Sequence, residues 1–192
     1  MRMFVALVPP EDALADLGEF VAPRREAEPG FRWTAPEQWH VTLSFMADVP
    51  ERRFDDLLAR LERAARRRTP FTARITGGGA FPNPARAKVL YAGLSADPDT
   101  EELRRLATGA RAAGNKAGAA AAGGPFHPHV TLARLRGPLE ATRCVRVLDG
   151  YRGPEWQART ITLIGSHLGE GPHRRPRYEP VASFDLGDAD RG

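Results

Sequence analysis

The chain has 192 residues, of which 42% are hydrophobic and 27% are charged. This length and composition predict one folded unit with a real core and exclude a disordered or fibrous protein. The early apolar run Met3–Val8 is far too short to span a membrane, and with a single cysteine, Cys144, neither an internal disulfide nor a thiolate metal cage can form. The net charge of +4 is compatible with an anionic substrate. We expect a cytoplasmic monomer with no membrane partner.

The first part of the chain predicts two strands and two helices. Residues 3–8 form an apolar run that ends at a proline pair, which is typical of a buried strand. A helix is expected from about Glu11, and a second strand over residues 39–46. The strongest helical pattern covers residues 51–68, whose apolar side chains fall on one stripe. We interpret the three arginines at its end, 66–68, as cations favoured by the helix dipole, with an RNA-binding patch as the alternative.

The second part of the chain predicts further strands over residues 71–76 and 88–94, separated by a Gly- and Pro-containing turn region from Gly77 to Pro84. A helix is expected from an Asp97–Pro98 cap to about Ala113, followed by a flexible Gly/Ala-rich surface loop over residues 114–124. A strand over 129–135, a helix over 139–149 and strands near 159–168 and 178–186 complete the series. No regular βαβ rhythm emerges, so we predict an α+β fold with antiparallel sheet.

The most informative feature is a tetrapeptide, His-Val-Thr-Leu, that occurs at residues 40–43 and again at 129–132. One copy lies in each half of the chain, which is typical of a duplicated unit or of two converging half-sites. Strand alternation places His40 and Thr42 on one face, and His129 and Thr131 likewise, while the valines and leucines face a core. Each motif then presents an imidazole and a hydroxyl about 6–7 Å apart.

Two such motifs facing one another suit acid–base chemistry at phosphorus. Histidine titrates near neutral pH, so one copy can be protonated while its twin is neutral. The two imidazoles can then act as general base and general acid in an in-line displacement, each contributing about 10²–10⁴-fold. Threonine hydroxyls can donate hydrogen bonds to the non-bridging oxygens as charge develops. This chemistry requires no metal and no cofactor.

Two simpler interpretations stand beside this one. A single His-x-Thr in a strand is usually structural, and only the repeat favours catalysis. The spacing of His127 and His129 is found in some zinc sites, but no thiolate cluster or His-Glu-x-x-His pattern accompanies it, so we predict no metal site. We interpret His127 as a residue at the rim of the site, and assign no role to His167 and His173.

These motifs resemble those of the 2H phosphoesterase superfamily, and within it the RNA 2′,3′-cyclic phosphodiesterases, also called 2′-5′ RNA ligase-like proteins. The resemblance covers nearly the whole chain. It includes Arg2-x-Phe4 at the start, Trp33 and Phe45 on either side of the first motif, and the segment Phe126-x-Pro128 through Arg134 around the second. The tail from Ile161 to Phe184, with Ser166 and Tyr178, is similar to the closing strands of that family.

The resemblance implies a fold and a reaction. The fold is one bilobal domain over residues 1–192, with two pseudo-symmetric lobes of antiparallel sheet flanked by helices and the active site in the cleft between them. The reaction is hydrolysis of a terminal 2′,3′-cyclic phosphate on RNA to a 2′-phosphate. His40 would protonate the departing 3′ oxygen, His129 would activate water, and Thr42 and Thr131 would hold the phosphate.

Arg134 is a weaker candidate for substrate binding, because unbroken alternation places it on the face opposite Thr131. We interpret four further arginines as solvated surface charges, with contact to an RNA backbone as the alternative: Arg136, Arg174, Arg175 and Arg177. Other functions stay open, namely action on small cyclic nucleotides, 2′-5′ ligation of RNA ends, and an RNA-end-binding module without catalysis.

Overall fold

The structure is a computed structural model that describes residues 1–188. It has an α+β fold, as predicted. The helices are α1 (Glu11–Ala27), α2 (Phe54–Arg66), α3 (Thr100–Lys116) and α4 (Thr142–Asp149). The strands are β1 (Met3–Leu7), β2 (Arg32–Trp33), β3 (Val41–Met46), β4 (Phe71–Phe81), β5 (Ala87–Ser95), β6 (His129–Leu139), β7 (Arg152–Ala158), β8 (Thr160–His167) and β9 (Arg177–Asp185).

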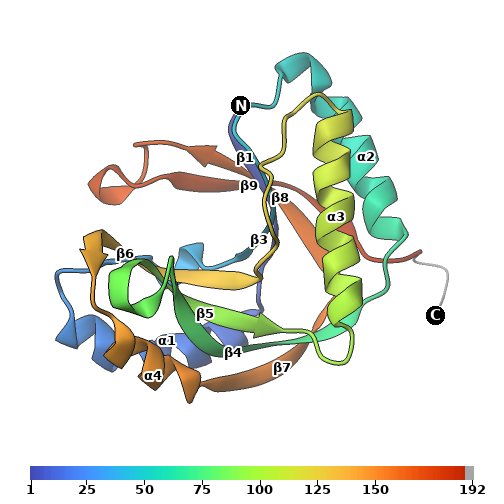
Figure 1. The fold of residues 1–192 in the computed structure, drawn as a ribbon. Coiled ribbons are helices and arrows are strands. Elements are labelled where there is room, and N and C mark those ends of the chain that lie inside the picture. The colour runs from blue at the N-terminus through green and yellow to red at the C-terminus, as the bar shows by residue number, and fades with distance from the viewer. Residues whose placement is uncertain (189–192) are drawn as a thin grey trace.

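All strands join one curled antiparallel sheet in the order β7-β4-β5-β6-β3-β1-β8-β9, with β2 paired to β6 (Figure 1). The order is symmetric about its centre, where Val41 of β3 lies opposite Val130 of β6. We call the group β4–β7 the central lobe, and the group β1, β3, β8 and β9 the terminal lobe. The two copies of the repeated motif therefore stand next to each other where the lobes join.

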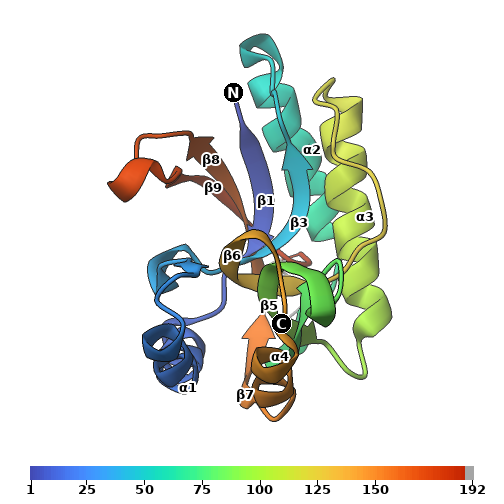
Figure 2. The same cartoon turned by 60° about the vertical axis from the view of Figure 1, so that its left-hand side comes forward.

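The helices cross between the lobes. Helix α1 follows β1 of the terminal lobe but packs on β7, and α4 packs on β4, so both cover the central lobe. Helix α3 follows β5 of the central lobe but packs on β3, and α2 lies beside it and against β9 (Figure 2). Each chain half thus contributes elements to both lobes, which makes the lobes interdependent. Within residues 1–188 no helix is both long and apolar enough to cross a membrane.

Burial follows the sequence pattern most closely in β1 and α2. All five residues of β1 are buried, as expected of a continuous apolar run. The apolar stripe of α2 buries Leu57, Leu61 and Ala65. Trp39, immediately before the first motif, is 2% exposed. A buried side chain of this size fixes the backbone that carries His40.

A turn separates β4 from β5 as predicted, but it begins at Pro82 and not at Gly77, because β4 continues through the glycines to Phe81. The pairing with β5 shifts between Ile75 and Gly78, and Gly77 at the shift has a φ of +65°. A Cβ on Gly78 would lie 2.7 Å from the carbonyl oxygen of Tyr91. These glycines mark a bulge and a close approach of two strands rather than a turn.

The loop predicted over residues 114–124 is also different in the structure. Helix α3 continues to Lys116, and Gly114 packs against the sulfur of Met46. Beyond the helix, Ala117 and Ala119 are buried, and Ala122 N–H donates to the Phe45 carbonyl. Small side chains here permit close packing on β3, which their composition alone does not distinguish from flexibility.

Two strands and two element boundaries also differ from the predictions. Strands β2 and β7 were not expected, because neither has a clear alternation of apolar residues. Strand β6 runs to Leu139, so α4 begins only at Thr142. Helix α3 begins at Thr100 rather than at the Asp97–Pro98 pair, although Asp97 still accepts a hydrogen bond from the Thr100 hydroxyl.

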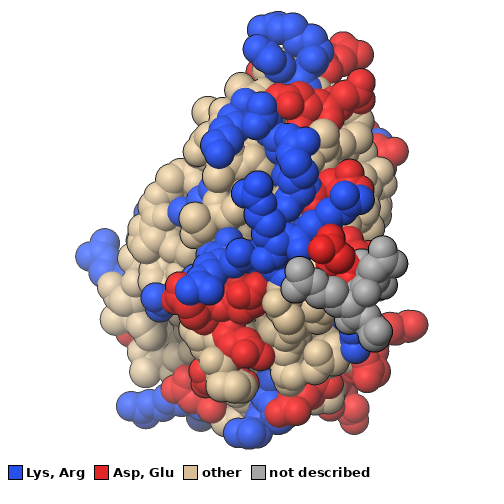
Figure 3. All heavy atoms as spheres, turned by 90° about the vertical axis from the view of Figure 1, so that its right-hand side faces the viewer, with Lys and Arg blue, Asp and Glu red and all other residues tan. Residues whose placement is uncertain are grey.

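The outer surface of α2 and α3 is strongly basic (Figure 3). Arg66 pairs with Glu62 and Arg68 lies 3.7 Å from Glu102, whereas Arg67 lines a hollow between the two helices. We call this the α2–α3 hollow; its cationic lining residues are Arg60, Arg63, Arg67, Arg68, Arg104, Arg105 and Lys116.

Candidate active site

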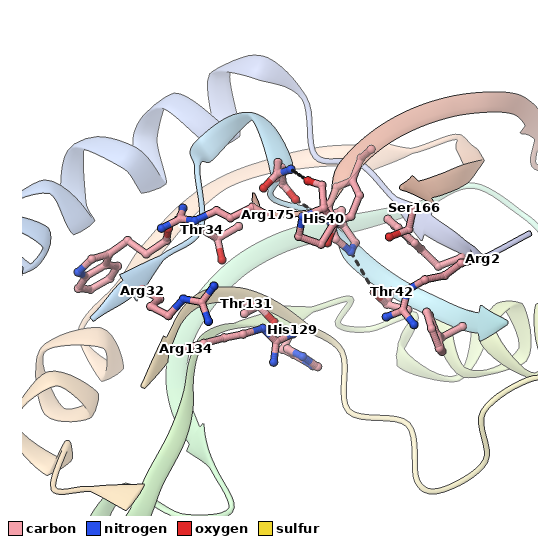
Figure 4. A pocket seen from close by; sticks show the side chains of 16 residues that line it. Arg2, Arg32, Thr34, His40, Thr42, His129, Thr131, Arg134, Ser166 and Arg175 are labelled. Carbon is pink, nitrogen blue, oxygen red and sulfur yellow. Dashed lines mark hydrogen bonds between the residues drawn. The ribbon is translucent and has the colours of Figure 1, made fainter. Parts of the chain in front are cut away.

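The two repeated motifs contribute to one cleft of about 510 Å³. The antiparallel Val41–Val130 pair brings the motifs together, and the histidine and threonine of each copy point into the same space (Figure 4). All five residues that the sequence singles out line this cleft. The full lining is Arg2, Phe4, Arg32, Trp33, Thr34, Gln38, His40, Thr42, Phe45, His129, Thr131, Arg134, Ser166, Arg175, Pro176 and Tyr178.

Both imidazoles are held by the same local hydrogen bond. The Nδ1 atom of His40 lies 2.7 Å from the carbonyl oxygen of Gln38, and that of His129 lies 2.6 Å from the carbonyl oxygen of His127. Because a carbonyl can only accept, Nδ1 must donate in both rings. In the neutral form each histidine therefore has an unprotonated Nε2.

Aromatic rings surround each histidine. Phe4 stacks on His40 with 4.5 Å between ring centroids, and Tyr178 meets the same ring edge-on at 5.5 Å. Around His129, Phe81 lies edge-on at 5.0 Å and Tyr91 is tilted at 5.3 Å. These rings restrict rotation of the imidazoles and remove water from around them.

Burial lowers the pKa of His40 below its ordinary value of 6.5, and the charge of His129 lowers it further, against the hydrogen bond to Gln38. Burial also lowers the pKa of His129, against its bond to His127, and the charges of His127 and Arg134 act in the same direction as burial. Without substrate, both histidines are therefore predominantly neutral at pH 7. A bound anion would favour protonation of either one.

The prediction that Arg134 lies opposite Thr131 is wrong, because β6 contains a bulge. Thr131 pairs with Tyr91 and Ala133 pairs with Leu90, so Leu132 is an extra residue and alternation reverses after it. Arg134 consequently shares the cleft face with Thr131.

The first motif has the same bulge. Thr42 pairs with Ala6 and Ser44 with Val5, which leaves Leu43 as the extra residue. Phe45 therefore faces the cleft from the position that corresponds to Arg134 in the second motif. The guanidinium of Arg2 lies 4.4 Å from the centre of the Phe45 ring. At corresponding positions the second motif thus presents the cation Arg134, and the first presents the Phe45 ring with the cation Arg2 over it.

The hydroxyl of the first motif is closer to its imidazole than strand geometry predicts. Thr42 Oγ1 lies 3.1 Å from His40 Nε2, so the predicted separation of 6–7 Å between imidazole and hydroxyl is wrong for this motif. That figure is the rise of two residues along a strand, and the long imidazole side chain reaches over this distance to the hydroxyl. With Nε2 unprotonated, the hydroxyl donates to it. When His40 is protonated, Nε2 donates to the hydroxyl oxygen instead, and the hydroxyl proton becomes available for another acceptor.

Several cleft residues lie outside the sequence-based site. The loop before β9 brings in Arg175, whose guanidinium donates to the Trp33 carbonyl, and the Gln38 side chain donates to the Pro176 carbonyl. Arg2, Ser166 and Tyr178 come from the two ends of the terminal lobe. Arg2 and Phe4 share a face of β1 by period-2 alternation, which is a usable signal for Arg2. The interpretation of Arg175 as a solvated surface charge is wrong, because its side chain is half-buried in the cleft and bonded to the Trp33 carbonyl. Nothing near it in the sequence indicates this position.

The remaining histidines lie elsewhere. His127 is exposed and contributes its carbonyl oxygen, while His167 Nε2 lies 2.8 Å from Glu179. His173 belongs to the short turn before Arg175. Across residues 1–188 no three His, Cys, Asp or Glu side chains form a group suited to holding a metal ion.

Most of the chain matches the model of a known protein family. The model of a family described as LigT like Phosphoesterase matches residues 7–91 and 94–173. The chain belongs to the LigT-like phosphoesterase family. This membership confirms the resemblance to 2H phosphoesterases that the repeated motifs indicate.

Members of the LigT-like family with curated names are similar over almost the whole chain. The RNA 2′,3′-cyclic phosphodiesterase of Thermus thermophilus is 35% identical, covering 97% of this chain and 90% of that protein. The protein of the same name from Archaeoglobus fulgidus is 31% identical, covering 96% and 100%. A crystal structure of a Thermus thermophilus protein matches with a TM-score of 0.75 at 33% identity, covering 98% of this chain and 100% of that chain. The structure of Escherichia coli LigT, with a TM-score of 0.76 at 24% identity, covers 97% and 98% and supports the fold.

Proposed function

We propose that this protein hydrolyses the terminal 2′,3′-cyclic phosphate of RNA to a 2′-phosphate, with His40 and His129 as the acid–base pair. The observation that carries the proposal is the pair of imidazoles in one cleft, each held through Nδ1 so that Nε2 is the reactive nitrogen. Relatives up to 35% identical carry the name RNA 2′,3′-cyclic phosphodiesterase, which supports the same reaction here.

In the proposed reaction, neutral His129 accepts a proton from water through Nε2 as the water oxygen attacks phosphorus. The bond between phosphorus and the 3′ oxygen breaks, and protonated His40 donates its Nε2 proton to that oxygen. The products are a 3′ hydroxyl and a 2′-phosphate, and the two histidines have exchanged protonation states. This order follows the roles that the family resemblance implies, and each transfer contributes about 10²–10⁴-fold.

The remaining site residues are proposed to hold the phosphate. The hydroxyls of Thr42 and Thr131 donate to its non-bridging oxygens, and protonation of His40 releases the Thr42 hydroxyl proton for this purpose. The guanidinium of Arg134, brought to the cleft face by the bulge at Leu132, pairs with the same anion. Thr131 and Arg134 already line the cleft before substrate binds, whereas the Thr42 hydroxyl becomes available to the phosphate only when His40 is protonated.

The test is turnover of an oligonucleotide with a 2′,3′-cyclic end in excess EDTA, with identification of the product isomer. We expect undiminished turnover and a 2′-phosphate product. His40→Ala and His129→Ala should each lower kcat by about 10²–10⁴-fold while the circular dichroism spectrum stays unchanged. Loss of activity on chelation would contradict the metal-independent reaction, and a 3′-phosphate product would contradict the assigned leaving group.

The same assay separates the alternatives. Turnover confined to cyclic mononucleotides would indicate a small-molecule phosphoesterase, joining of 2′-5′ ends would indicate ligation, and tight RNA binding without turnover would indicate a binding module. We also propose that residues 1–192 act as one bilobal unit, because both lobes contribute to the cleft. The cytoplasmic location and the monomeric state stay predictions.

A further inference from the structure

A second hollow of about 480 Å³ adjoins the cleft. Arg32 and Arg175 line both spaces, so the hollow and the cleft meet at these two side chains. Arg136, His173 and Phe31 also line the hollow. Among residues 1–188, no acidic side chain lines it. We call it the arginine subsite.

The cations of the arginine subsite extend directly from the proposed phosphate site. Arg136 follows Arg134 by two residues on β6, on the same side of the strand and one pleat further from His129. Arg32 of β2 lies opposite Arg134 in the β2–β6 pair. Figure 4 shows Arg32, Arg134 and Arg175 gathered toward one end of the cleft and Arg2 toward the other. The positive charge is therefore distributed unequally along the cleft.

The environment of these arginines favours a phosphate over a fixed partner within the protein. Within residues 1–188 neither Arg32 nor Arg136 makes an ion pair, and both are exposed. Arg175 is held by its bond to the Trp33 carbonyl, which leaves further N–H groups of its guanidinium for a ligand. Phe31 adds an aromatic ring to the same hollow. Cations beside an aromatic face are typical of sites that bind single-stranded nucleic acid.

We propose that the arginine subsite binds the nucleotide on the 5′ side of the cyclic end, with Arg32, Arg136 and Arg175 on its phosphodiester and Phe31 against its base. This inference rests on the proposed function of the cleft and specifies its substrate as an RNA chain rather than a cyclic mononucleotide. A 2′,3′-cyclic mononucleotide has no second phosphodiester to place there, because its only one is the cyclic group held at the histidines. The subsite therefore adds binding energy only for substrates of two nucleotides or more.

The α2–α3 hollow is the other basic surface, and it serves as a control. Of the described residues, none lines both that hollow and the cleft, and the lining of the hollow includes the acidic Glu101 and no aromatic ring. When the cyclic end of an RNA lies at the histidines, the arginine subsite is the basic surface next to it, and the α2–α3 hollow is not adjacent. Arg63 of the α2–α3 hollow is exposed, like Arg136. Substituting Arg63 therefore removes the same charge as substituting Arg136, but outside the arginine subsite.

The first experiment compares a 2′,3′-cyclic mononucleotide with a trinucleotide that ends in the same cyclic nucleotide. Arg136→Gln should lower kcat/KM for the trinucleotide about 10-fold, mainly through KM, and leave the mononucleotide unchanged. Arg63→Gln should change neither. Equal loss on both substrates, no loss on either, or an equal effect of Arg63→Gln would overturn the proposal. If the wild type turns over neither substrate, the proposed function of the cleft fails first.

The second experiment removes the charge from the substrate. Replacing the last phosphodiester of the trinucleotide with a neutral methylphosphonate should lower kcat/KM of the wild type about 10-fold. The same replacement should not lower kcat/KM of Arg136→Gln any further. Such non-additivity shows that the side chain and that phosphate act on each other. Additive losses would place the phosphate elsewhere and contradict the subsite.

Discussion

At the scale of single residues, the site depends on which nitrogen of each imidazole is free. Nδ1 of His40 and of His129 is engaged by a backbone carbonyl two residues earlier, which leaves Nε2 for the proton transfers of the proposed reaction. The proposed reaction needs one histidine protonated and one neutral. Because burial lowers the pKa of both, the singly protonated enzyme is most populated below pH 6.5.

The first prediction concerns pH. The profile of kcat/KM, which reports the free enzyme, should be bell-shaped with its maximum below pH 6.5 and should fall as pH rises further. The anionic substrate raises the pKa of the histidines in the complex, so the alkaline limb of kcat should lie at higher pH. Arg134→Gln removes a positive charge that lowers the pKa of His129, and should shift one limb of the kcat/KM profile to higher pH. A maximum well above pH 7 for kcat/KM would contradict this account.

The second prediction concerns the hydroxyl of Thr42. Thr42→Val keeps the shape of the side chain but removes the donor, and it should lower kcat about 10²-fold. Thr42→Ser retains the hydroxyl and should keep most of the activity. Steady-state kinetics on a cyclic-ended oligonucleotide measures both variants. If the valine and serine variants were equally impaired, packing rather than the hydroxyl would explain the role of Thr42.

At the scale of elements, bulges and loops decide which side chains reach the cleft. The bulges at Leu43 and Leu132 turn Phe45 and Arg134 onto the cleft face. The loop before β9 folds back through close contacts, since Gly171 N–H donates to the Arg175 carbonyl over 2.8 Å. This contact brings Arg175 to the cleft.

The third prediction follows from that loop. A Cβ on Gly171 would lie 2.7 Å from the carbonyl oxygen of Arg175, and a backbone oxygen cannot rotate away. Gly171→Ala should therefore displace Arg175 and raise KM for cyclic-ended RNA several-fold, with kcat little changed. Gly123→Ala is the matched control, because no atom lies within 4 Å of its added Cβ. An unchanged KM for Gly171→Ala would remove Arg175 from substrate binding.

The accuracy of the sequence-based account differs between elements for physical reasons. A run of apolar residues identifies β1 because burial on both faces requires it. The glycines of β4 and the alanines after α3 mislead, because small residues serve both turns and close packing. The repeat locates His40 and His129, but the face of Arg134 depends on a bulge. That bulge arises from pairing with β5, which the local sequence does not reveal.

At the scale of the whole molecule, the two lobes are joined so that neither completes the cleft alone. His40 and Thr42 belong to the terminal lobe and His129 and Thr131 to the central lobe. The two motifs are far apart in the chain and adjacent only through the pairing of Val41 with Val130. The distance between the two histidines therefore depends on the packing of the entire sheet.

The central claim is that the two histidines have different roles, and a substrate with sulfur in place of the bridging 3′ oxygen tests it most directly. A thiolate leaves without protonation, so a missing general acid matters little. On this substrate His40→Ala should recover to within about 10-fold of the wild type, while His129→Ala should stay impaired by at least about 10²-fold. Recovery of His129→Ala alone would reverse the two roles. Recovery of neither variant would contradict the assignment of a general acid to this pair.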